Sequence, residues 1–344
     1  MAGKPPRIKP RVDDLLFGEE TESLEAPRQR FGQRQGRRAQ INKMERTALM
    51  REAERQAAGD IQSLPIGQVI QVFSLYCHVK GPEGMRLCVV RKTLNKLIDC
   101  SIVVGDEVRF RDADTVSQIP GEPFKEAVIE ELLPRRTMLT RADSFQEARQ
   151  QPIVANAQQV LIVASVVLPD VKWGLIDRML VAARAGGLEP MVCLNKVDLA
   201  EDMKSADEVL DHYAAMGIQC AKISATTDIG LGAIRDWLKD KMTVLSGHSG
   251  VGKSTLIAAI QPGLDIRIGA ISNYTAKGRH TTSSARRYEL DAGGCVIDTP
   301  GVKMFGLWGV TRENLPEFFP DVAGGDAPQW RLESYQRILE SLAG

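Results

Sequence analysis

Hydrophobic residues in the middle of the chain form short uninterrupted runs that alternate with amphipathic segments. Residues 159–168 are almost entirely apolar, which is typical of a strand buried on both faces of a parallel sheet. Residues 175–185 carry apolar side chains at helical spacing and end at two glycines, a frequent helix stop. We therefore predict a doubly wound α/β sheet, in which ligands bind at the carboxyl ends of the strands. The other predicted strands are residues 190–194, 218–223 and 242–245, and the other helices are 206–216, 232–240 and 255–260.

Residues 61–133 show a different pattern, in which short runs of β-forming residues are separated by turn residues. The runs lie at 67–80, 85–91, 107–111 and 127–133. Several short strands in so short a segment predict a small barrel of the OB type. The usual ligand of such a barrel is single-stranded or looped nucleic acid, although a fold alone does not establish that use.

The first 60 residues read as a tail. Residues 28–38 contain five arginines and no acidic residue. Such a segment buries too little apolar surface to offset its ordering entropy, so we expect it to be disordered. The arginines either attach to RNA phosphates or only keep the tail solvated, and the sequence alone does not separate these alternatives.

Composition places the chain among ordinary globular proteins. Hydrophobic residues make up 43% of it, charged residues 26%, and the formal net charge is zero. No apolar run is long enough to cross a bilayer, so we expect no membrane association. The six cysteines are scattered without a C-x-x-C pair, which favours buried thiols in a reducing compartment over a zinc site.

A glycine-rich stretch lies between the last predicted strand and the last predicted helix. It fits G-x-x-x-x-G-K-[ST], whose backbone N–H groups surround phosphates at the start of a helix. Lys253 can reach the β- and γ-phosphates, and the Ser254 hydroxyl can bind Mg²⁺. We expect His248 to shape the loop rather than to react. The predicted nucleotide-binding residues here are Gly247, His248, Ser249, Gly250, Val251, Gly252, Lys253, Ser254 and Thr255.

A second motif, Asn195-Lys196-Val197-Asp198, follows the predicted strand at 190–194. The Asp198 carboxylate can accept hydrogen bonds from the two donors of a guanine edge, and adenine lacks that donor pair. Ser224 and Ala225 follow the next strand, where such a pair typically offers a backbone N–H to the guanine carbonyl. Together these residues predict a guanine-nucleotide site.

A third motif, Asp298-Thr299-Pro300-Gly301, follows the apolar run at 293–297. Asp298 is placed to hold Mg²⁺, directly or through water, and the Gly301 N–H to contact the γ-phosphate. Either Thr281 or Thr282 would complete the Mg²⁺ shell when the γ-phosphate is present, and the sequence does not separate the two.

The order of these motifs differs from that of an ordinary GTPase, because N-K-x-D and Ser-Ala precede the phosphate loop. The chain therefore looks like a circularly permuted GTPase. Its barrel, Gly-His-Ser-Gly-Val-Gly-Lys-Ser, Gly-Arg-His-Thr-Thr at 278–282 and Asp-Thr-Pro-Gly-Val at 298–302 resemble the ribosome small-subunit-dependent GTPase family, RsgA (YjeQ). The resemblance extends over residues 61–308 and resumes at 335–342.

The resemblance implies a cytoplasmic GTPase of late 30S maturation that binds GTP or GDP with Mg²⁺, contacts 16S rRNA and is stimulated by the subunit. Together with the sequence patterns, it divides the chain into four regions: a basic, disordered tail at 1–60, an OB-type RNA-binding barrel at 61–134, a permuted P-loop GTPase domain at 135–308 and a short helical C-terminal element at 309–344. We expect a monomer.

The chain departs from the family at two places. The family carries a C-terminal zinc module, but no Cys or His follows Cys295 here, so zinc is not expected and the C-terminal RNA contacts are in doubt. The arginine-rich tail could supply replacement contacts. Many GTPases also place Gln directly after D-x-x-G, whereas Val302 stands there and cannot orient water.

These departures shape the predicted mechanism. We expect slow intrinsic hydrolysis that the subunit accelerates. His280 is the candidate for positioning water, and contact with RNA is its competing role. Two rival functions are a P-loop ATPase or nucleotide kinase, against which Asp198 argues, and an RNA-binding factor with a vestigial nucleotide site, against which Lys253, Ser254 and Asp298 argue.

Overall fold

The computed structural model describes residues 61–73, 76–91, 94, 101–117, 123–142, 150–263, 285–299 and 305–342. All of them belong to the second of two compact units, Ala58–Gly344. The predicted basic tail lies outside the described residues. A short 3₁₀ helix, Ile61–Ser63, opens the described part of the chain.

Five strands form a closed barrel, as the sequence pattern predicts. Their order is β1-β2-β3-β5-β4, and β1 also pairs with β4, which closes the barrel. Its core is a cluster that includes Val69, Val79, Phe110 and Ile129, all buried. The strands are β1 (Ile66–Val72), β2 (Cys77–Gly81), β3 (Gly84–Val90), β4 (Glu107–Val116) and β5 (Lys125–Leu132).

One predicted strand of the barrel is wrong. The run at 67–80 does not form a single strand, because the Phe73 N–H donates to the Tyr76 carbonyl at 2.8 Å and turns the chain back. Strands β1 and β2 on either side of this turn pair antiparallel. The run is rich in β-formers throughout, so its composition gave no sign of the reversal. A second unpredicted feature is the hairpin of β6 (Met138–Ala142) and β7 (Gln150–Ala155), which follows the barrel.

The predicted doubly wound sheet is confirmed. Strand order is β10-β9-β8-β11-β13-β12, with all neighbours parallel except the antiparallel pair β12–β13. Strand β12 also meets β1 at one residue pair, Gln71 with Arg286. The elements are β8 (Gln159–Ser165), α3 (Trp173–Ala185), β9 (Glu189–Asn195), η3 (Val197–Leu199), α4 (Lys204–Ala215), β10 (Gln219–Lys222), α5 (Leu231–Leu238), β11 (Met242–Ser246), α6 (Lys253–Ile260), β12 (Arg286–Glu289) and β13 (Cys295–Asp298).

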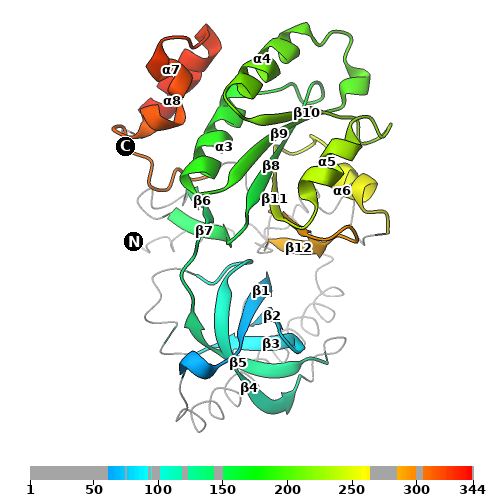
Figure 1. Cartoon of the computed structure of the whole chain (residues 1–344), viewed down its shortest axis with the longest axis vertical. Coiled ribbons are helices and arrows are strands. Elements are labelled where there is room, and N and C mark those ends of the chain that lie inside the picture. Colours follow the sequence, from blue (N-terminus) through cyan, green and yellow to red (C-terminus); the bar gives the residue numbers. More distant parts are fainter. Residues whose placement is uncertain are drawn as a thin grey trace, which may run out of the picture. The chain divides into compact units, whose positions relative to one another are not determined.

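Successive residues of the buried strands face opposite layers of helices, as the two-residue period of a strand requires. On one face, Val160 and Ile162 pack with the apolar side of α3 and α4. On the other, Leu161 and Val163 pack with α5 and α6. Figure 1 shows the two helical layers on either side of the sheet.

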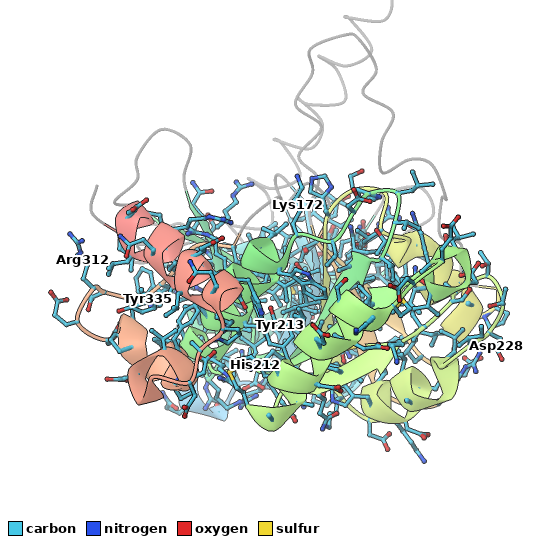
Figure 2. All side chains as sticks on the ribbon, turned by 90° about the horizontal axis from the view of Figure 1, so that it is seen from above. Lys172, His212, Tyr213, Asp228, Arg312 and Tyr335 are labelled. Carbon is cyan, nitrogen blue, oxygen red and sulfur yellow. The ribbon has the colours of Figure 1, made fainter. Side chains whose placement is uncertain are left out.

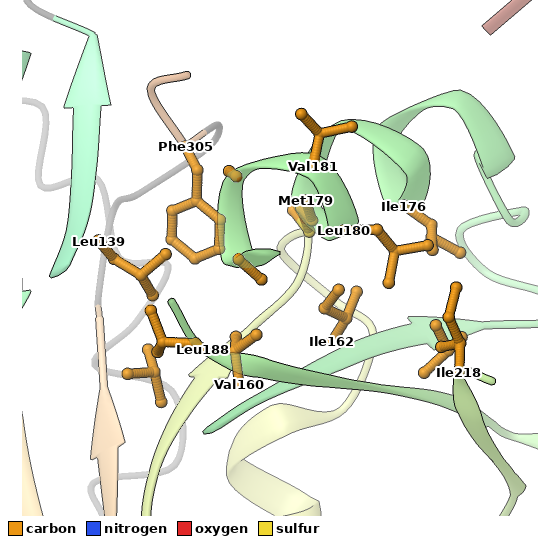
Figure 3. Packing of buried hydrophobic residues seen from close by; sticks show 14 of the residues in the cluster. Leu139, Val160, Ile162, Ile176, Met179, Leu180, Val181, Leu188, Ile218 and Phe305 are labelled. Carbon is orange, nitrogen blue, oxygen red and sulfur yellow. The ribbon is translucent and has the colours of Figure 1, made fainter. Parts of the chain in front are cut away.

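The first of these layers also receives the chain that follows the Asp-Thr-Pro-Gly motif. Phe305 is buried in the same cluster as Leu139 of β6 and Met179 of α3 (Figure 3). The Gly306 N–H donates to the Thr140 carbonyl at 2.8 Å. Residues next to the third motif are therefore anchored to the hairpin and to α3.

The chain ends in the predicted helical element, which consists of η4 (Leu315–Phe318), α7 (Pro320–Gly324) and α8 (Gln329–Ser341). Leu315, Phe319 and Ile338 extend the cluster that contains α3. Among the described residues, no helix is long and apolar enough to span a membrane. Five of the six cysteines lie in the described part, and all five are free thiols.

Candidate nucleotide-binding site

The predicted motifs meet at the carboxyl edge of the sheet. Asn195 ends β9, the phosphate loop follows β11, and Asp298 ends β13. Because Leu245 and Asp298 are paired in register on parallel strands, the Asp298 carboxylate lies beside the start of the loop. The topology thus joins segments about 100 residues apart in the sequence into one edge, as expected for this sheet type.

The phosphate loop needs glycine at positions where its backbone bends into the left-handed region. Gly247 has φ 148°, and a Cβ there would lie 2.1 Å from the Val163 carbonyl oxygen. Gly252 has φ 95°, and a Cβ there would lie 2.4 Å from the Asn195 side-chain nitrogen. Larger residues are excluded both by the backbone conformation and by these close approaches.

Lys253 begins α6 and folds back over the loop. Its Nζ donates to the carbonyl oxygens of Gly247 at 2.6 Å and His248 at 3.0 Å. Burial lowers the pKa of Lys253, and the nearby Asp298 carboxylate opposes that shift. The ammonium group therefore lies at the loop with only neutral carbonyls as hydrogen-bond acceptors, beside the positive end of a helix.

Asn195 connects three loops at the edge. Its side-chain nitrogen donates to the Val251 carbonyl at 2.9 Å, and its Oδ1 accepts from the N–H groups of Lys196 at 2.8 Å and Ala225 at 3.1 Å. The N-K-x-D segment, the Ser-Ala loop and the phosphate loop are therefore held together by one side-chain amide, whose nitrogen and oxygen both form hydrogen bonds.

Lys196 makes a second connection of the same kind. Its Nζ donates to the Gly250 carbonyl at 2.8 Å and also to the Leu168 carbonyl. Asp198, two residues further on in η3, is exposed to solvent. The first two residues of the motif thus fix the loops, while its carboxylate remains accessible.

The Ser-Ala pair differs from the expectation in one respect. The Ser224 N–H donates to the Ile229 carbonyl at 3.0 Å, and the Ala225 N–H donates to Asn195 Oδ1. Neither N–H is free to meet a guanine carbonyl. A guanine base would have to share the Ala225 N–H with Asn195, so the assignment of this pair stays a prediction.

Asp298 is buried and has an unsatisfied oxygen. Its Oδ1 accepts no hydrogen bond from the described residues. Burial raises the pKa of Asp298, and Lys253 opposes the shift. A buried carboxylate with an open coordination position, on the same sheet edge as the start of α6 with its Ser254 hydroxyl, has the oxygen chemistry that Mg²⁺ prefers. The residues present therefore fit a magnesium ion.

Several predicted site residues lie outside the described residues: His280, Thr281, Thr282, Gly301 and Val302. The described residues contain no cluster of three His, Cys, Asp or Glu side chains suited to a metal ion.

The loop that follows β8 also reaches the site, which the sequence analysis did not anticipate. Its Pro169 and Lys172 line a cavity of about 30 Å³ together with Gly247 and His248 of the phosphate loop. The Ser165 hydroxyl donates to the Pro169 carbonyl at 2.7 Å and holds the loop in place. A Leu-Pro-Asp sequence directly after a buried parallel strand was the available signal, since every carboxyl-end loop faces this edge.

Comparison with known proteins agrees with this geometry. The model of the RsgA GTPase family matches residues 132–308. The small ribosomal subunit biogenesis GTPase RsgA of Serratia proteamaculans is 34% identical over 344 residues, which cover 90% of this chain and 94% of that protein. RsgA 1 of Vibrio vulnificus is 33% identical over 308 residues, covering 80% and 84%.

Two solved structures share the fold of this chain. YjeQ from Thermotoga maritima superposes with a TM-score of 0.62 at 28% identity, covering 81% of this chain and 99% of that one. YloQ, described as a circularly permuted GTPase, gives a TM-score of 0.58 at 24% identity and shows similarity of fold. The predicted fold class, a permuted GTPase domain after a barrel, is confirmed.

Proposed function

The chain belongs to the RsgA GTPase family, and on that premise we propose that it hydrolyses GTP to GDP and phosphate during maturation of the small ribosomal subunit. Its relatives are named for this process. The proposal includes 16S rRNA as the partner within the subunit, action in the cytoplasm as a monomer, and stimulation of hydrolysis by the subunit.

The observation that best supports GTP as the substrate is the joining of three loops at one edge. Asn195 and Lys196 hold the phosphate loop beside the exposed Asp198 carboxylate. A phosphate cradle and a guanine-selective acceptor are thereby kept at a constant separation. Asp198 would accept from the two guanine donors, and ATP would leave that carboxylate without its partners.

The phosphates would be bound by charge and by backbone N–H groups. Lys253 would exchange its two loop carbonyls for phosphate oxygens, which is favourable because a carbonyl carries no net charge. Ser254 and Asp298 would hold Mg²⁺, together with Thr281 or Thr282. When bound, Mg²⁺ would neutralise charge on the β- and γ-phosphate oxygens.

Water activation is the step for which this chain needs its partner. The side chain of Val302 offers no hydrogen bond to water, so we assign the positioning of water to His280 in the complex with the subunit. If His280→Ala retained full subunit-stimulated turnover, this role would be excluded. The Gly301 N–H would contact the γ-phosphate.

Binding of rRNA is assigned to the barrel. Phe73 and Tyr76 stack with ring centroids 4.5 Å apart where β1 turns into β2, and Phe73 and Phe124 each lie edge-on to His78. Clustered aromatic rings on an OB-type barrel favour single-stranded nucleic acid, because bases stack on them. The arginine-rich segment at 28–38 would add phosphate contacts. Deleting residues 1–60 without weakening subunit binding would exclude that addition.

The deciding experiment measures phosphate release from GTP and from ATP, with and without purified small ribosomal subunits. We expect slow release from GTP alone, faster release with subunits, and none from ATP above the level of Lys253→Ala. Hydrolysis of ATP would indicate another P-loop enzyme. Subunit binding without GTP hydrolysis would indicate an assembly factor with a vestigial site.

A further inference from the structure

A groove lies between the α3–α4 layer and the segment that leads into α8. Its volume is about 550 Å³. Trp173 at the start of α3 and Trp330 in the first turn of α8 contribute two indole rings, and Pro328 a third apolar surface. Glu208 of α4 and Asp326 contribute two carboxylates. We name this feature, defined by Trp173, Glu208, Asp326 and Trp330, the tryptophan groove.

The two indoles are held by one buried ring. Tyr213 is fully buried, and the Trp173 and Trp330 rings meet it edge-on at centroid distances of 6.2 and 5.6 Å. The Tyr213 hydroxyl donates to Asp177 at 2.7 Å, and Asp177 is paired with Arg331. Figure 2 shows Tyr213 and its neighbour His212 where the C-terminal helices meet α4. The groove is therefore built in advance of any ligand.

The exposed charges of the groove are both negative. The guanidinium of Arg331 lies 5.8 Å from the centroid of the Trp330 ring, but it is buried and paired with Asp177 and Asp321. Glu208 and Asp326 are exposed, and neither forms an ion pair with another described residue. Among the described residues that line the groove there is no lysine or arginine, and His212 is directed to Asp321 at 2.9 Å. Such a surface repels the phosphates of RNA and attracts cations.

We infer that the tryptophan groove is a docking site for a lysine- or arginine-rich segment of a partner protein. An indole face attracts a guanidinium or ammonium group through its π electrons, and a carboxylate at the same place pairs with its charge. Aromatic side chains held rigid in a recess are also the usual anchors of protein interfaces. None of the residues that line the groove also lines the cavity at the phosphate loop, and the inference does not rest on GTP hydrolysis.

Peptide binding to the full chain tests this inference. The probe is a fluorescein-labelled nine-residue peptide of alternating glycine and arginine, and the reference is the same peptide with glutamate in place of arginine. Fluorescence anisotropy at low salt should show saturable binding of the arginine peptide with a micromolar Kd, and no binding of the glutamate peptide.

Three variants test whether the peptide binds at the groove or is attracted by acidic residues anywhere on the surface. Glu208→Gln with Asp326→Asn should raise the Kd about tenfold by removing both carboxylates. Trp330→Leu should raise it about threefold, because the apolar volume stays while the π face is lost. The matched control, Asp236→Asn with Glu317→Gln, removes two exposed acids elsewhere and should change the Kd less than twofold.

Equal Kd values for the groove and control variants would overturn the inference. The Glu208 and Asp326 changes are on exposed side chains, so their result stands even if Trp330→Leu unfolds, which a thermal melt would show. Tighter binding of a single-stranded RNA to the wild type than to the double variant would assign the groove to RNA instead. If the peptide binds only after the five arginines at 28–38 are replaced by serine, the occupant of the groove would be the arginine-rich segment of this same chain and not a partner protein.

Discussion

The nucleotide edge and the Arg331 cluster, which joins the C-terminal helices to α3 and α4, are two polar regions that differ in whether their charges are paired within the protein. The Arg331 cluster consists of Arg331, Asp177, Asp321, Tyr213 and His212. Arg331 is buried in α8 and pairs with Asp177 of α3 and, at 2.8 Å, with Asp321 of α7. Its guanidinium also lies 4.2 Å from the centroid of the Phe319 ring. The positive charge of Arg331 is thus paired with two carboxylates of the protein itself, although Asp177 Oδ2 accepts no hydrogen bond from the described residues.

At the nucleotide edge the charges remain open. Asp298 has a buried oxygen without a donor among the described residues, Lys253 contacts only carbonyls, and Asp198 is exposed. This difference in charge pairing indicates that the two regions have different roles. A cluster whose charges are paired within the protein supports the fold, whereas charges that are held in place without an ion-pair partner indicate a binding site.

Removing the central cation of the Arg331 cluster should have the largest effect. Arg331→Leu leaves Asp177 and Asp321 buried without their cation, which should lower the free energy of unfolding by about 3–5 kcal/mol. Urea titration followed by tryptophan fluorescence measures this. Arg337→Leu, an exposed arginine on the same helix paired with Glu333, should cost less than about 0.5 kcal/mol. Equal losses of unfolding free energy in the two variants would show that the Arg331 cluster stabilises the fold no more than an exposed ion pair does.

Removing a charge at the nucleotide edge should lower the rate of GTP hydrolysis and leave the stability of the fold nearly unchanged. Lys253→Ala should reduce the rate of GTP hydrolysis by about 10²–10³-fold, because a donor prepared for developing charge is lost. Phosphate release at saturating GTP measures the rate, and a thermal melt provides the control. A variant that unfolds as readily as Arg331→Leu would show that Lys253 also supports the fold.

Asp198 should control the choice of base. Asp198→Asn replaces an acceptor of two hydrogen bonds, so the Kd for GDP should rise about 10–100-fold while that for ADP stays weak. Isothermal titration with both nucleotides checks this. The matched control is Asp202→Asn, because Asp202 is an exposed aspartate on the same segment; it should leave the Kd for GDP unchanged. An unaltered preference for GDP in Asp198→Asn would remove Asp198 from the base site.

The smallest effect is a dependence of stability on pH through Asp321. Burial raises its pKa, but hydrogen bonds from Arg331 and His212 outweigh burial and lower the pKa to about 2. A lowered native pKa stabilises the fold above the unfolded value near 3.9, and this stabilisation is lost as the pH falls toward 2. The stability difference between wild type and Asp321→Asn should therefore shrink by about 1 kcal/mol between pH 6 and pH 3. A constant difference would contradict the assignment.

Motifs and elements with strong local patterns could be predicted from the sequence. The buried strand at 159–168, the helix at 175–185 and the phosphate loop are each encoded within a few residues of one another, and the structure contains all three. The turn within 67–80 could not be found, because it depends on β1 and β2 pairing with each other rather than on a glycine or proline. The hairpin of β6 and β7 was not predicted for a related reason, since its two strands are short and contain both polar and apolar residues.

By itself, the sequence determined the order of the motifs, and therefore that this is a permuted GTPase with Val302 in place of the usual glutamine. It also determined that no Cys or His follows Cys295. These conclusions depend on residue identity at short spacing, which folding does not alter. The tertiary structure alone decided that Asn195 and Lys196 hold the loops while Asp198 stays accessible. It also decided that Arg331 meets Asp177 across 154 positions of the chain and thereby sets the walls of the tryptophan groove. No local pattern encodes such pairs, because they exist only once the sheet brings distant segments together.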